Sequence, residues 1–443
     1  MNVGIVGGGI TGLTAAYWLL KTGHAATVYE GAPEVGGLAS AVNVQGVWVD
    51  KFYHCILPSD TALLDLVREL GLGDQIYWHE TEMGFLHRGR LFPLTTPRDL
   101  LRFTPLSLVD RIRLGVSGLY TKSLRDWKPL ERVTAQQWLT RMCGERVFNT
   151  VWKPLLVFKF GSRWAEAPAT YLWARVVRQG TTRQGGSQRE RLAYVKGGFR
   201  LIIGRLADEV RRLGGTIHTG TRVDRIATAR GRVEGLVVGG TLERFDKVVS
   251  SVPMTQLLRL VDPAALGEGF RHDGVAYQAA VNVLLVLKEP LTRYYWLPIV
   301  ESDVSFAGIV ETTNLIRRED LGGISLVYLV NYVPREDPLF SMDPEVLITR
   351  SIDELRRVFP TFAPGSVLES HVHRAAFVEP VWTVNYSARL PRRALLDDSL
   401  FVLTTAQLYP AINSTSNCVA QVREVFPRLA TPIIAPQPPT RRT

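Results

Sequence analysis

Cysteine is scarce in this chain, and long apolar runs are missing from it. The three cysteines, Cys55, Cys143 and Cys418, lie far apart and lack the C-x-x-C spacing of zinc and redox sites. They argue against a disulfide framework and against a metal centre, and they favour a reducing cytoplasm. No stretch approaches the roughly 20 consecutive apolar residues that a membrane-spanning helix needs. These absences predict a chain that folds in water around its own core.

Acidic residues are too few to balance the basic ones. Lys and Arg total 52 against 42 Asp and Glu, a formal net charge of +10. Such a surface attracts nucleic acid, anionic lipid or anionic substrates, but there is no nucleic-acid motif and no run of five basic residues. We therefore expect no nucleic-acid partner. In 98–132, basic and apolar residues alternate, which indicates either helices whose long Arg stems cover apolar surface or peripheral contact with a membrane.

The chain does contain enough apolar residues for a substantial core. Of its 443 residues, 46% are hydrophobic and 21% are charged, and this length predicts two to three domains. No internal repeat is present. Since an apolar strand begins at residue 2, we expect no signal or transit peptide before it.

The first 30 residues predict a βαβ unit that binds a dinucleotide. An apolar strand over 2–6, a helical pattern over 13–22 and a second strand over 25–29 follow one another, with a G-x-G-x-x-G turn after the first strand. The glycines of such a turn allow the tight bend, the approach of a pyrophosphate and close helix packing. The helix N-terminus adds free N–H groups and partial positive charge. The three glycines are Gly7, Gly9 and Gly12.

Two further features decide between dinucleotides. Glu30 ends the second strand about 20 residues after the glycines, where an acid accepts hydrogen bonds from a ribose diol. Its charge repels a 2′-phosphate and no arginine follows in 31–33, which disfavours NADP. A second glycine pair, Gly36 and Gly37, then follows. A plain nicotinamide-binding domain has no need of this second phosphate-facing turn, so NAD is disfavoured too.

These motifs resemble the N-terminal signature of the FAD-dependent amine oxidase superfamily, which includes protoporphyrinogen oxidases, carotenoid desaturases and UDP-galactopyranose mutases. In that family both glycine turns approach the FAD pyrophosphate, and the acid binds the adenosine ribose. Leu38 stands where many members have a basic residue, which is closer to the protoporphyrinogen oxidase-like and sugar-mutase-like branches. The resemblance implies non-covalent FAD and the following cofactor-binding residues: Gly7, Gly9, Ile10, Thr11, Gly12, Glu30, Gly36, Gly37, Leu38, Val223, Pro253 and Tyr409.

Later segments extend the resemblance over nearly the whole chain. Residues 194–199 resemble the turn that leads from the substrate domain back into the FAD domain. Residues 221–223 resemble the short strand whose valine backbone contacts the adenine, and 245–253 the strand that ends in a proline near the cofactor. Residues 400–422 resemble the closing segment beneath the flavin, although Thr405-Ala406 stands where many relatives have Gly-Asp or Gly-Arg.

The pattern predicts an α/β fold, in which a discontinuous Rossmann-type FAD-binding domain joins an α+β substrate domain of mixed sheet plus helices. We expect the FAD-binding domain from 1–75, 195–255 and 390–430, and the substrate domain from 76–194 and 256–389. The polar segment 179–190 predicts a loop, and 431–443 a disordered tail. Helices are expected at 61–70, 98–125, 134–150, 165–178, 201–213 and 344–358, and strands at 216–219, 275–287, 295–301, 324–332 and 367–372.

The resemblance implies that the flavin carries the redox step, and the sequence itself offers three candidate catalytic residues. His54 follows a stretch that runs towards the flavin in relatives, and it acts either as acid/base or as a hydrogen-bonding support. Lys159 is either a charge near the flavin or an anionic substrate, or part of a structural ion pair. Tyr409 is expected beside the flavin, on the substrate face.

Aromatic and basic residues of the expected substrate domain give weaker indications. Four tryptophans are either walls of an apolar pocket, as in aromatic cages for amines, or ordinary core residues. Four basic residues favour an anionic substrate over an amine. The tryptophans are Trp152, Trp164, Trp173 and Trp382, and the basic residues are Lys159, Arg163, Arg175 and Arg178.

The leading hypothesis is a FAD-dependent oxidoreductase that takes a hydride from a C–N or C–C bond of a small substrate, with oxygen or another acceptor reoxidising the flavin. A redox-neutral mutase acting on a nucleotide sugar is the first alternative. A flavin-free binding protein similar to Rab GDP-dissociation inhibitors is the second, although the intact glycines and Glu30 argue against it. The oligomeric state stays open.

Overall fold

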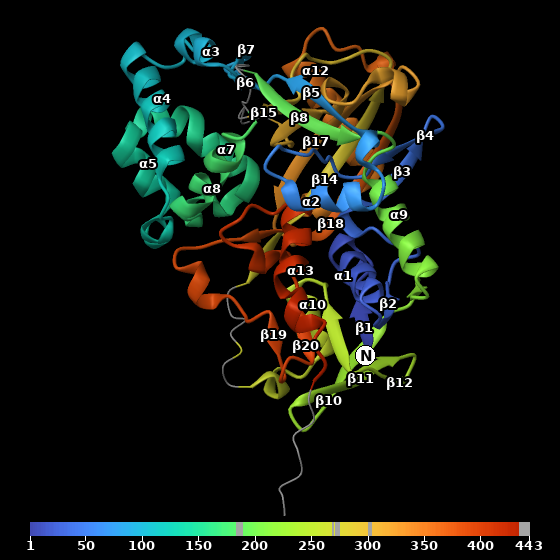
Figure 1. Cartoon of the computed structure of the whole chain (residues 1–443). Coiled ribbons are helices and arrows are strands. Elements are labelled where there is room, and N and C mark those ends of the chain that lie inside the picture. Colours follow the sequence, from blue (N-terminus) through green and yellow to red (C-terminus); the bar gives the residue numbers. More distant parts are fainter. Residues whose placement is uncertain (183–188, 268–269, 271–274, 300–303, 434–443) are drawn as a thin grey trace, which may run out of the picture.

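The computed structural model describes residues 1–182, 189–267, 270, 275–299 and 304–433. A six-stranded sheet in the order β19-β20-β13-β1-β2-β9 forms the lower half of the molecule in Figure 1. Only β19 runs antiparallel to its neighbour. The fold is the predicted α/β class, and the sheet strands are β1 (Asn2–Val6), β2 (Ala25–Tyr29), β9 (Thr216–His218), β13 (Lys247–Ser250), β19 (Ala394–Leu395) and β20 (Leu400–Val402).

Both faces of this sheet are covered, so its strands are apolar on both sides. Val3 and Ile5 pack against the helices of one face, whereas Val6 packs against a small antiparallel sheet on the other. Figure 1 shows the helices side by side over the sheet. The helices are α1 (Ile10–Lys21), α9 (Phe199–Arg212) and α13 (Thr415–Leu429), and the small sheet consists of β10 (Val223–Ala229), β11 (Arg232–Val238) and β12 (Thr241–Arg244).

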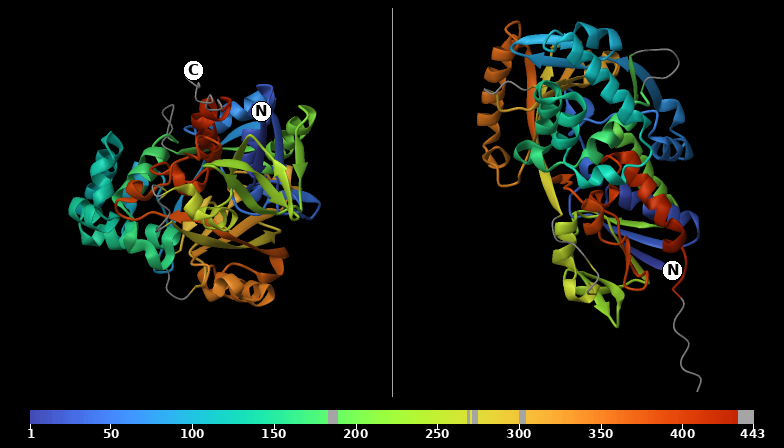
Figure 2. Two further views of the ribbon diagram at one scale, coloured as in Figure 1. Left: turned by 90° about the horizontal axis from the view of Figure 1, so that it is seen from below. Right: turned by 90° about the vertical axis from the view of Figure 1, so that its left-hand side faces the viewer.

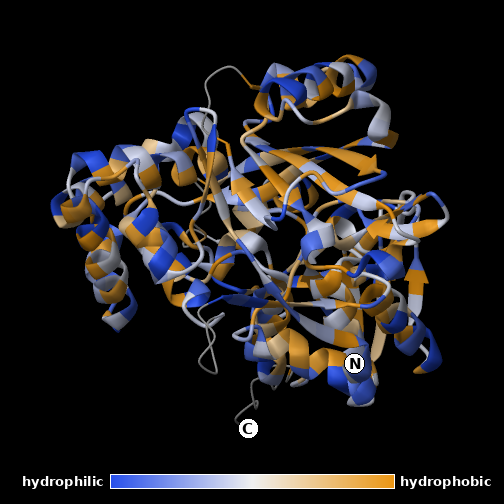
Figure 3. Ribbon diagram, turned by 90° about the horizontal axis from the view of Figure 1, so that it is seen from above, coloured by the Kyte–Doolittle hydropathy of each residue, from blue (hydrophilic) through white to orange (hydrophobic). Residues whose placement is uncertain are grey.

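A second, antiparallel sheet in the order β15-β16-β17-β14-β18 lies above the first. Alternate residues of β14 face opposite sides: Val283 packs with α12, and Leu284 packs towards the parallel-sheet half of the molecule. Figure 3 shows that apolar residues dominate these strands. The elements of this layer are β14 (Ala276–Leu287), β15 (Trp296–Pro298), β16 (Gly308–Glu311), β17 (Ser325–Val333), β18 (Val367–Val381), α11 (Pro338–Ser341) and α12 (Pro344–Val358), whereas α10 (Met254–Leu260) packs against the small sheet of the lower half.

Strand β18 is much longer than the predicted 367–372. Its second half carries polar residues such as His373 and Arg374, which line a cavity instead of facing the core. The alternation that predicts a half-buried strand is therefore lost there, although pairing with β14 continues to Val381.

A helical layer forms the upper left of Figure 1. The single helix expected over 98–125 is two helices, because α4 begins anew at the N-cap Ser107, whose side chain accepts a hydrogen bond from the Asp110 N–H. The helix expected over 134–150 breaks at Gly144, where φ is 87°. The helices are α3 (Pro97–Arg102), α4 (Leu108–Ser123), α5 (Ala135–Cys143), α6 (Glu145–Val147), α7 (Lys153–Phe160) and α8 (Ala169–Gln179).

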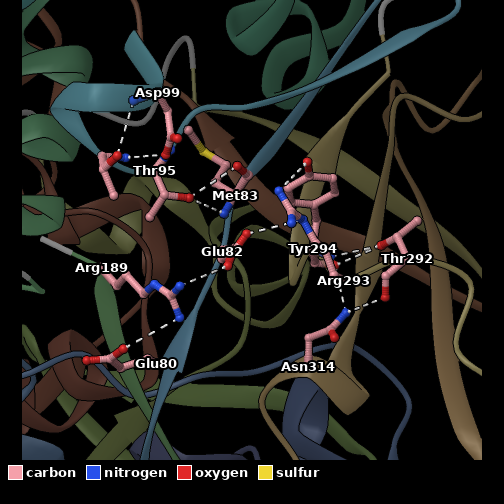
Figure 4. A network of polar contacts seen from close by, with 11 residues as sticks. Glu80, Glu82, Met83, Thr95, Asp99, Arg189, Thr292, Arg293, Tyr294 and Asn314 are labelled. Atoms are coloured by element: carbon pink, nitrogen blue, oxygen red, sulfur yellow. Dashed lines mark hydrogen bonds and ion pairs between the residues drawn. The ribbon is translucent and has the colours of Figure 1, made fainter. Parts of the chain in front are cut away.

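Short strand pairs and a polar network connect the layers. Figure 4 shows Arg293 and Arg189 converging on Glu82, at Nε–Oε2 and Nη2–Oε1 distances of 3.3 and 3.7 Å. The Met83 N–H donates to Thr95 Oγ1 over 2.7 Å, next to the N-terminus of α3. The network thus fastens the helical layer to the antiparallel sheet. The remaining elements are β3 (Ala41–Val44), β4 (Val47–Asp50), β5 (Ile76–Thr81), β6 (Gly84–His87), β7 (Arg90–Pro93), β8 (Glu190–Val195) and α2 (Thr61–Glu69).

Two predicted segments fall partly outside the described residues. Of the loop expected at 179–190, residues 183–188 are not described, and of the tail expected at 431–443, residues 434–443 are not described. Among the residues that are described, no helix is long and apolar enough to cross a membrane.

Candidate functional site

A cavity of about 780 Å³ lies where the parallel sheet, the antiparallel sheet and the helical layer meet. Its size is that of a small-molecule or cofactor site. The lining comes from the turn after β1, the 36–40 and 51–57 segments, α7, α8, β14, β17, β18 and the start of α13. A smaller cavity of about 330 Å³ shares Tyr53 and His54 with it. Residues far apart in the sequence, from Gly7 to Cys418, therefore converge on one site.

The two glycine turns form one end of this cavity. The Gly36 N–H donates a hydrogen bond of 2.9 Å to the Gly8 carbonyl, and Gly9 and Gly36 form a parallel bridge. A Cβ on Gly9 would meet no atom within 4 Å, so this backbone faces open space. Gly37 lies against Gly9 on the same side. An uncovered backbone at a helix N-terminus is a ready site for a phosphate.

Gly7 and Gly12 are required by packing. Gly7 has φ of 107° and a Cβ there would lie 2.5 Å from Ser251 Oγ. A Cβ on Gly12 would lie 2.0 Å from the Gly7 carbonyl oxygen, so only glycine lets α1 approach the strand. Gly12 does not line the cavity, whereas Gly7 does.

The backbone of the two glycine turns, around Gly9 and Gly37, is called the glycine cradle below. Glu30 is held at the edge of this cradle by hydrogen bonds within its own loop. Its carboxylate accepts hydrogen bonds from the Gly8 N–H over 2.7 Å and the Ala32 N–H over 2.8 Å. The Thr221 N–H donates to the Glu30 carbonyl over 2.9 Å, which brings the 221–223 segment alongside. Val223 itself is buried outside the cavity. The other expected contacts that do line the cavity are Ile10, Thr11, Leu38 and Pro253.

His54 lies between the two cavities. Its Nδ1 is 2.7 Å from the Phe52 carbonyl oxygen and 3.9 Å from Asp50 Oδ2, and its ring centroid is 4.6 Å from that of Phe199. Burial raises the pKa of Asp50, although His54 and the Tyr194 hydroxyl oppose this shift. A histidine fixed on one edge and open to a cavity fits both roles expected for it.

Lys159 lines the cavity and also forms an ion pair, as one of its two expected roles predicts. Its Nζ lies 2.9 Å from Glu379 Oε2 and 4.1 Å from the centre of the Tyr332 ring. Burial lowers the pKa of Lys159, but the Glu379 carboxylate together with Tyr171 and Tyr53 outweighs burial, and the pKa is raised overall. Lys159 therefore stays charged inside the cavity.

The remaining basic residues divide into three kinds. Arg178 lines the cavity and pairs with Asp60 at 2.8 Å. Arg163 lies outside it, bound to Glu166 at 2.6 Å. Arg175 lines the cavity, lies over the Trp296 ring at 5.3 Å, and belongs to none of the ion pairs found among the described residues.

Tyr409 does not lie on the cavity wall, which corrects the expectation that it faces the flavin and the substrate. It packs into an aromatic cluster, with ring centroids 4.9, 5.3 and 5.5 Å from those of Trp382, Tyr386 and Trp127. Segment 400–422 reaches the cavity through other residues, namely Thr405, Ile412, Asn413, Ser414, Thr415 and Cys418.

None of the four candidate tryptophans lines this cavity, and the core alternative is the correct one. Trp296, which the sequence does not distinguish from them, lines it instead. Cys55 and Cys418 do line it, as expected from their segments. Burial raises the pKa of both thiols, that of Cys418 to about 11, so both are protonated near neutral pH.

Five buried side-chain atoms of cavity-lining residues lack hydrogen-bond partners within the described chain. They are Arg178 Nε, Asn282 Oδ1, Tyr295 Oη, His373 Nε2 and Arg374 Nε. Buried polar atoms are rarely left in this state, which indicates that a bound molecule meets them. Burial lowers the pKa of His373 to about 4, with a further contribution from His371, so this ring is neutral at pH 7.

Comparison with known proteins agrees with this geometry. Residues 10–411 match the model of the flavin-containing amine oxidoreductase family. A probable zeta-carotene desaturase from Synechococcus elongatus is 26% identical over 35% of this chain and 37% of its own length, so the chain matches well under half of that protein. A 15-cis-phytoene desaturase from the same organism is 23% identical over 82% of this chain and 81% of its own.

The fold is also that of solved members. The crystal structure of a putative protoporphyrinogen oxidase from Exiguobacterium superposes with a TM-score of 0.76, covering 97% of this chain and 98% of its own at 18% identity. The family match spans most of the chain. The glycine cradle and Glu30 lie together at one end of the cavity, in the arrangement that binds a dinucleotide. The chain belongs to the flavin-containing amine oxidoreductase family, and its cofactor is FAD.

Proposed function

We propose that the protein is a FAD-dependent oxidoreductase that removes a hydride from a C–N or C–C bond of a small anionic substrate. The observation that carries the proposal is the position of Arg175, a guanidinium without a carboxylate partner among the described ion pairs, in the same cavity as the glycine cradle.

The cavity fits the cofactor at its nucleotide end. The backbone around Gly9 and Gly37 is open to a pyrophosphate, and Glu30 stands ready to exchange its hydrogen bonds with the Gly8 and Ala32 N–H groups for a ribose diol. When bound, the flavin supplies the two-electron acceptor, and the polypeptide binds and orients the substrate.

The charge of the cavity favours an anion. Its lining carries five Lys and Arg side chains against three carboxylates, and Glu30 is occupied at the nucleotide end. Lys159 is neutralised by Glu379 and Arg178 by Asp60, and the Arg374 guanidinium donates to the Met342 carbonyl. Lys51 and Arg175 belong to none of the ion pairs among the described residues, and of these two Arg175 carries the guanidinium that would hold a substrate carboxylate or phosphate. A guanidinium binds such groups through two parallel hydrogen bonds. The charged residues of the cavity lining are Lys51, Lys159, Arg175, Arg178, Arg374, Glu30, Glu190 and Glu379.

Aromatic residues would close the cavity around the bond to be oxidised. The Tyr53 and Tyr332 hydroxyls lie 3.2 Å apart, and burial raises the pKa of both, Tyr53 well above its ordinary value. Both hydroxyls therefore stay protonated at pH 7, and since one donates to the other, one O–H group is left as a donor beside Lys159 without adding negative charge. This arrangement supports binding of an anion and the exclusion of water from it.

Anaerobic reduction of the bound flavin tests the proposal. Flavin-loaded protein is mixed with carboxylate-bearing amines and with their neutral amides, and loss of oxidised-flavin absorbance is followed. Arg175→Met should raise the dissociation constant of the anionic substrate by about 10- to 100-fold, the value of one charged hydrogen-bonded contact. The neutral analogue should be unaffected.

Arg163→Met is the matched control, because Arg163 lies outside the cavity. Equal losses for anionic and neutral compounds, or an effect of Arg163→Met as large as that of Arg175→Met, would contradict an anion-binding role. Turnover of a sugar nucleotide by the reduced enzyme without consumption of an acceptor would establish the redox-neutral alternative instead.

A further inference from the structure

Helix α4 has its apolar side turned outwards. At 3.6 residues per turn, its buried face consists of three polar residues and one leucine, and its apolar residues fall on the opposite side within an arc of roughly 120°. These apolar side chains are between 53% and 72% exposed. The buried residues are Asp110, Leu114, Ser117 and Thr121, and the exposed apolar residues are Leu108, Val109, Ile112, Val116, Leu119 and Tyr120.

This stripe, together with Leu101 of α3, is unlike the rest of the described surface. Of thirteen exposed large apolar side chains in the described residues, seven lie between 101 and 120. Single exposed apolar residues are normal, whereas a contiguous patch marks a surface that binds something. We call these seven residues the α3–α4 face.

Basic residues border the α3–α4 face. Arg98, Arg102 and Arg125 are exposed and take part in none of the ion pairs among the described residues. The acid within α4, Asp110, is buried and lies 3.8 Å from both Arg113 and Arg146. The border is therefore positively charged, which complements an anionic partner.

The helix lies at the outer edge of the molecule. Figures 1 and 2 show α4 on the side of the helical layer away from the two sheets, and the network of Figure 4 fixes the chain just before α3. With 16 residues, α4 is about 24 Å long, shorter than a bilayer core. It suits a position in the plane of a membrane interface, with the apolar side down and arginines at the headgroups.

We propose that the α3–α4 face docks the protein onto an anionic lipid surface. A second copy of the chain fits less well, because a two-fold contact through this face would bring the same basic border against itself. A bilayer with anionic headgroups meets both the apolar stripe and the positive border.

Flotation with vesicles tests this proposal on the flavin-loaded protein. Wild type should bind phosphatidylcholine vesicles containing phosphatidylglycerol, bind pure phosphatidylcholine vesicles more weakly, and be released by salt. The double variant Ile112→Glu/Leu119→Glu should lower the fraction of protein bound to vesicles by about tenfold or more, because two apolar side chains that would be buried in the lipid are lost. Val346→Glu, at a 56% exposed residue of α12, is the matched control and should bind like wild type.

The outcomes separate the partners. Absence of wild-type binding to anionic vesicles, or equal binding by the double variant, would overturn the proposal. A dimer in light scattering that the double variant dissociates, without vesicle binding, would assign the face to a second copy. Unchanged flavin absorbance and melting temperature in the variants would show that the fold is intact.

Discussion

The Gly36 N–H donates a hydrogen bond of 2.9 Å to the carbonyl oxygen of Gly8, and this contact fastens the second glycine turn onto the first. The turns are separated by the whole of α1 and β2, but they form one continuous piece of uncovered backbone. No side chain of either turn can fill the space that a pyrophosphate occupies. The two turns therefore act as a single cofactor cradle.

Gly9→Val should abolish flavin binding while the chain still folds. A Cβ at Gly9 meets no protein atom within 4 Å, so the valine is accommodated in the protein but fills the cradle. Gly204→Val on α9, where a Cβ also meets no atom, is the matched control and should retain flavin. The ratio of flavin to protein absorbance in purified samples measures this. Full flavin content in Gly9→Val would show that the glycine cradle does not bind the cofactor.

Glu30→Ala should weaken FAD binding by about 10- to 100-fold, since a charged acceptor for the ribose is lost. The Gly8 and Ala32 N–H groups also lose their acceptor, so some disorder of the loop is expected. Glu30→Gln keeps one oxygen and should fall between Glu30→Ala and wild type. Titration of the apoprotein with FAD, followed by quenching of flavin fluorescence, gives the three dissociation constants. Equal constants would show that Glu30 does not bind the cofactor.

His54→Ala should keep its flavin and lose turnover, by about 100-fold if the ring transfers a proton. The ring borders both cavities, and one edge is held by the Phe52 carbonyl while the other stays available. Steady-state kinetics with flavin content as the companion measurement separate the two roles. Unchanged turnover, or loss of flavin together with turnover, would reduce His54 to structural support.

The cofactor end of the site was predictable because its signals are local. The strand, the glycines, the helix and Glu30 occupy 30 consecutive residues, and each follows from turn chemistry or helix periodicity. The structure reproduces the predicted strands 2–6 and 25–29 and starts the helix at Ile10, three residues earlier than expected. Gly12, which a purely local prediction treats as part of the turn, lies inside α1 and serves its packing.

The substrate end could not be predicted in the same way, because long-range pairing creates it. Arg175 and Trp296 are more than 100 residues apart, and nothing in either neighbourhood indicates that they touch. The resemblance predicts correctly that the segment of Tyr409 reaches the cavity, but the direction of this one side chain depends on the packing around it. Similarly, the second half of β18 is not predicted, because polar residues that face the cavity interrupt the alternation of apolar and polar residues.

His373 should make the protein less stable below neutral pH. Its folded pKa is about 4, lowered mainly by burial and further by the charges of His371 and Lys51, whereas an unfolded histidine has a pKa of about 6.5. The unfolded chain therefore binds more protons between these values, and stability is lost as the pH falls from about 6.5 towards about 4. The linkage between proton binding and folding predicts that the free energy of unfolding falls by about 2 kcal/mol between about pH 7.5 and about pH 5.

Urea unfolding of wild type and His373→Gln at both pH values checks this sign and size. The variant should lack this part of the pH dependence, so the difference between the two proteins should shrink or reverse at the acid end. His79→Gln, which removes an exposed histidine from β5, is the control and should keep the wild-type slope. If the slope in His373→Gln equals that of wild type, His373 is not held neutral against the cavity, and the open Nε2 atom would no longer support a bound partner there.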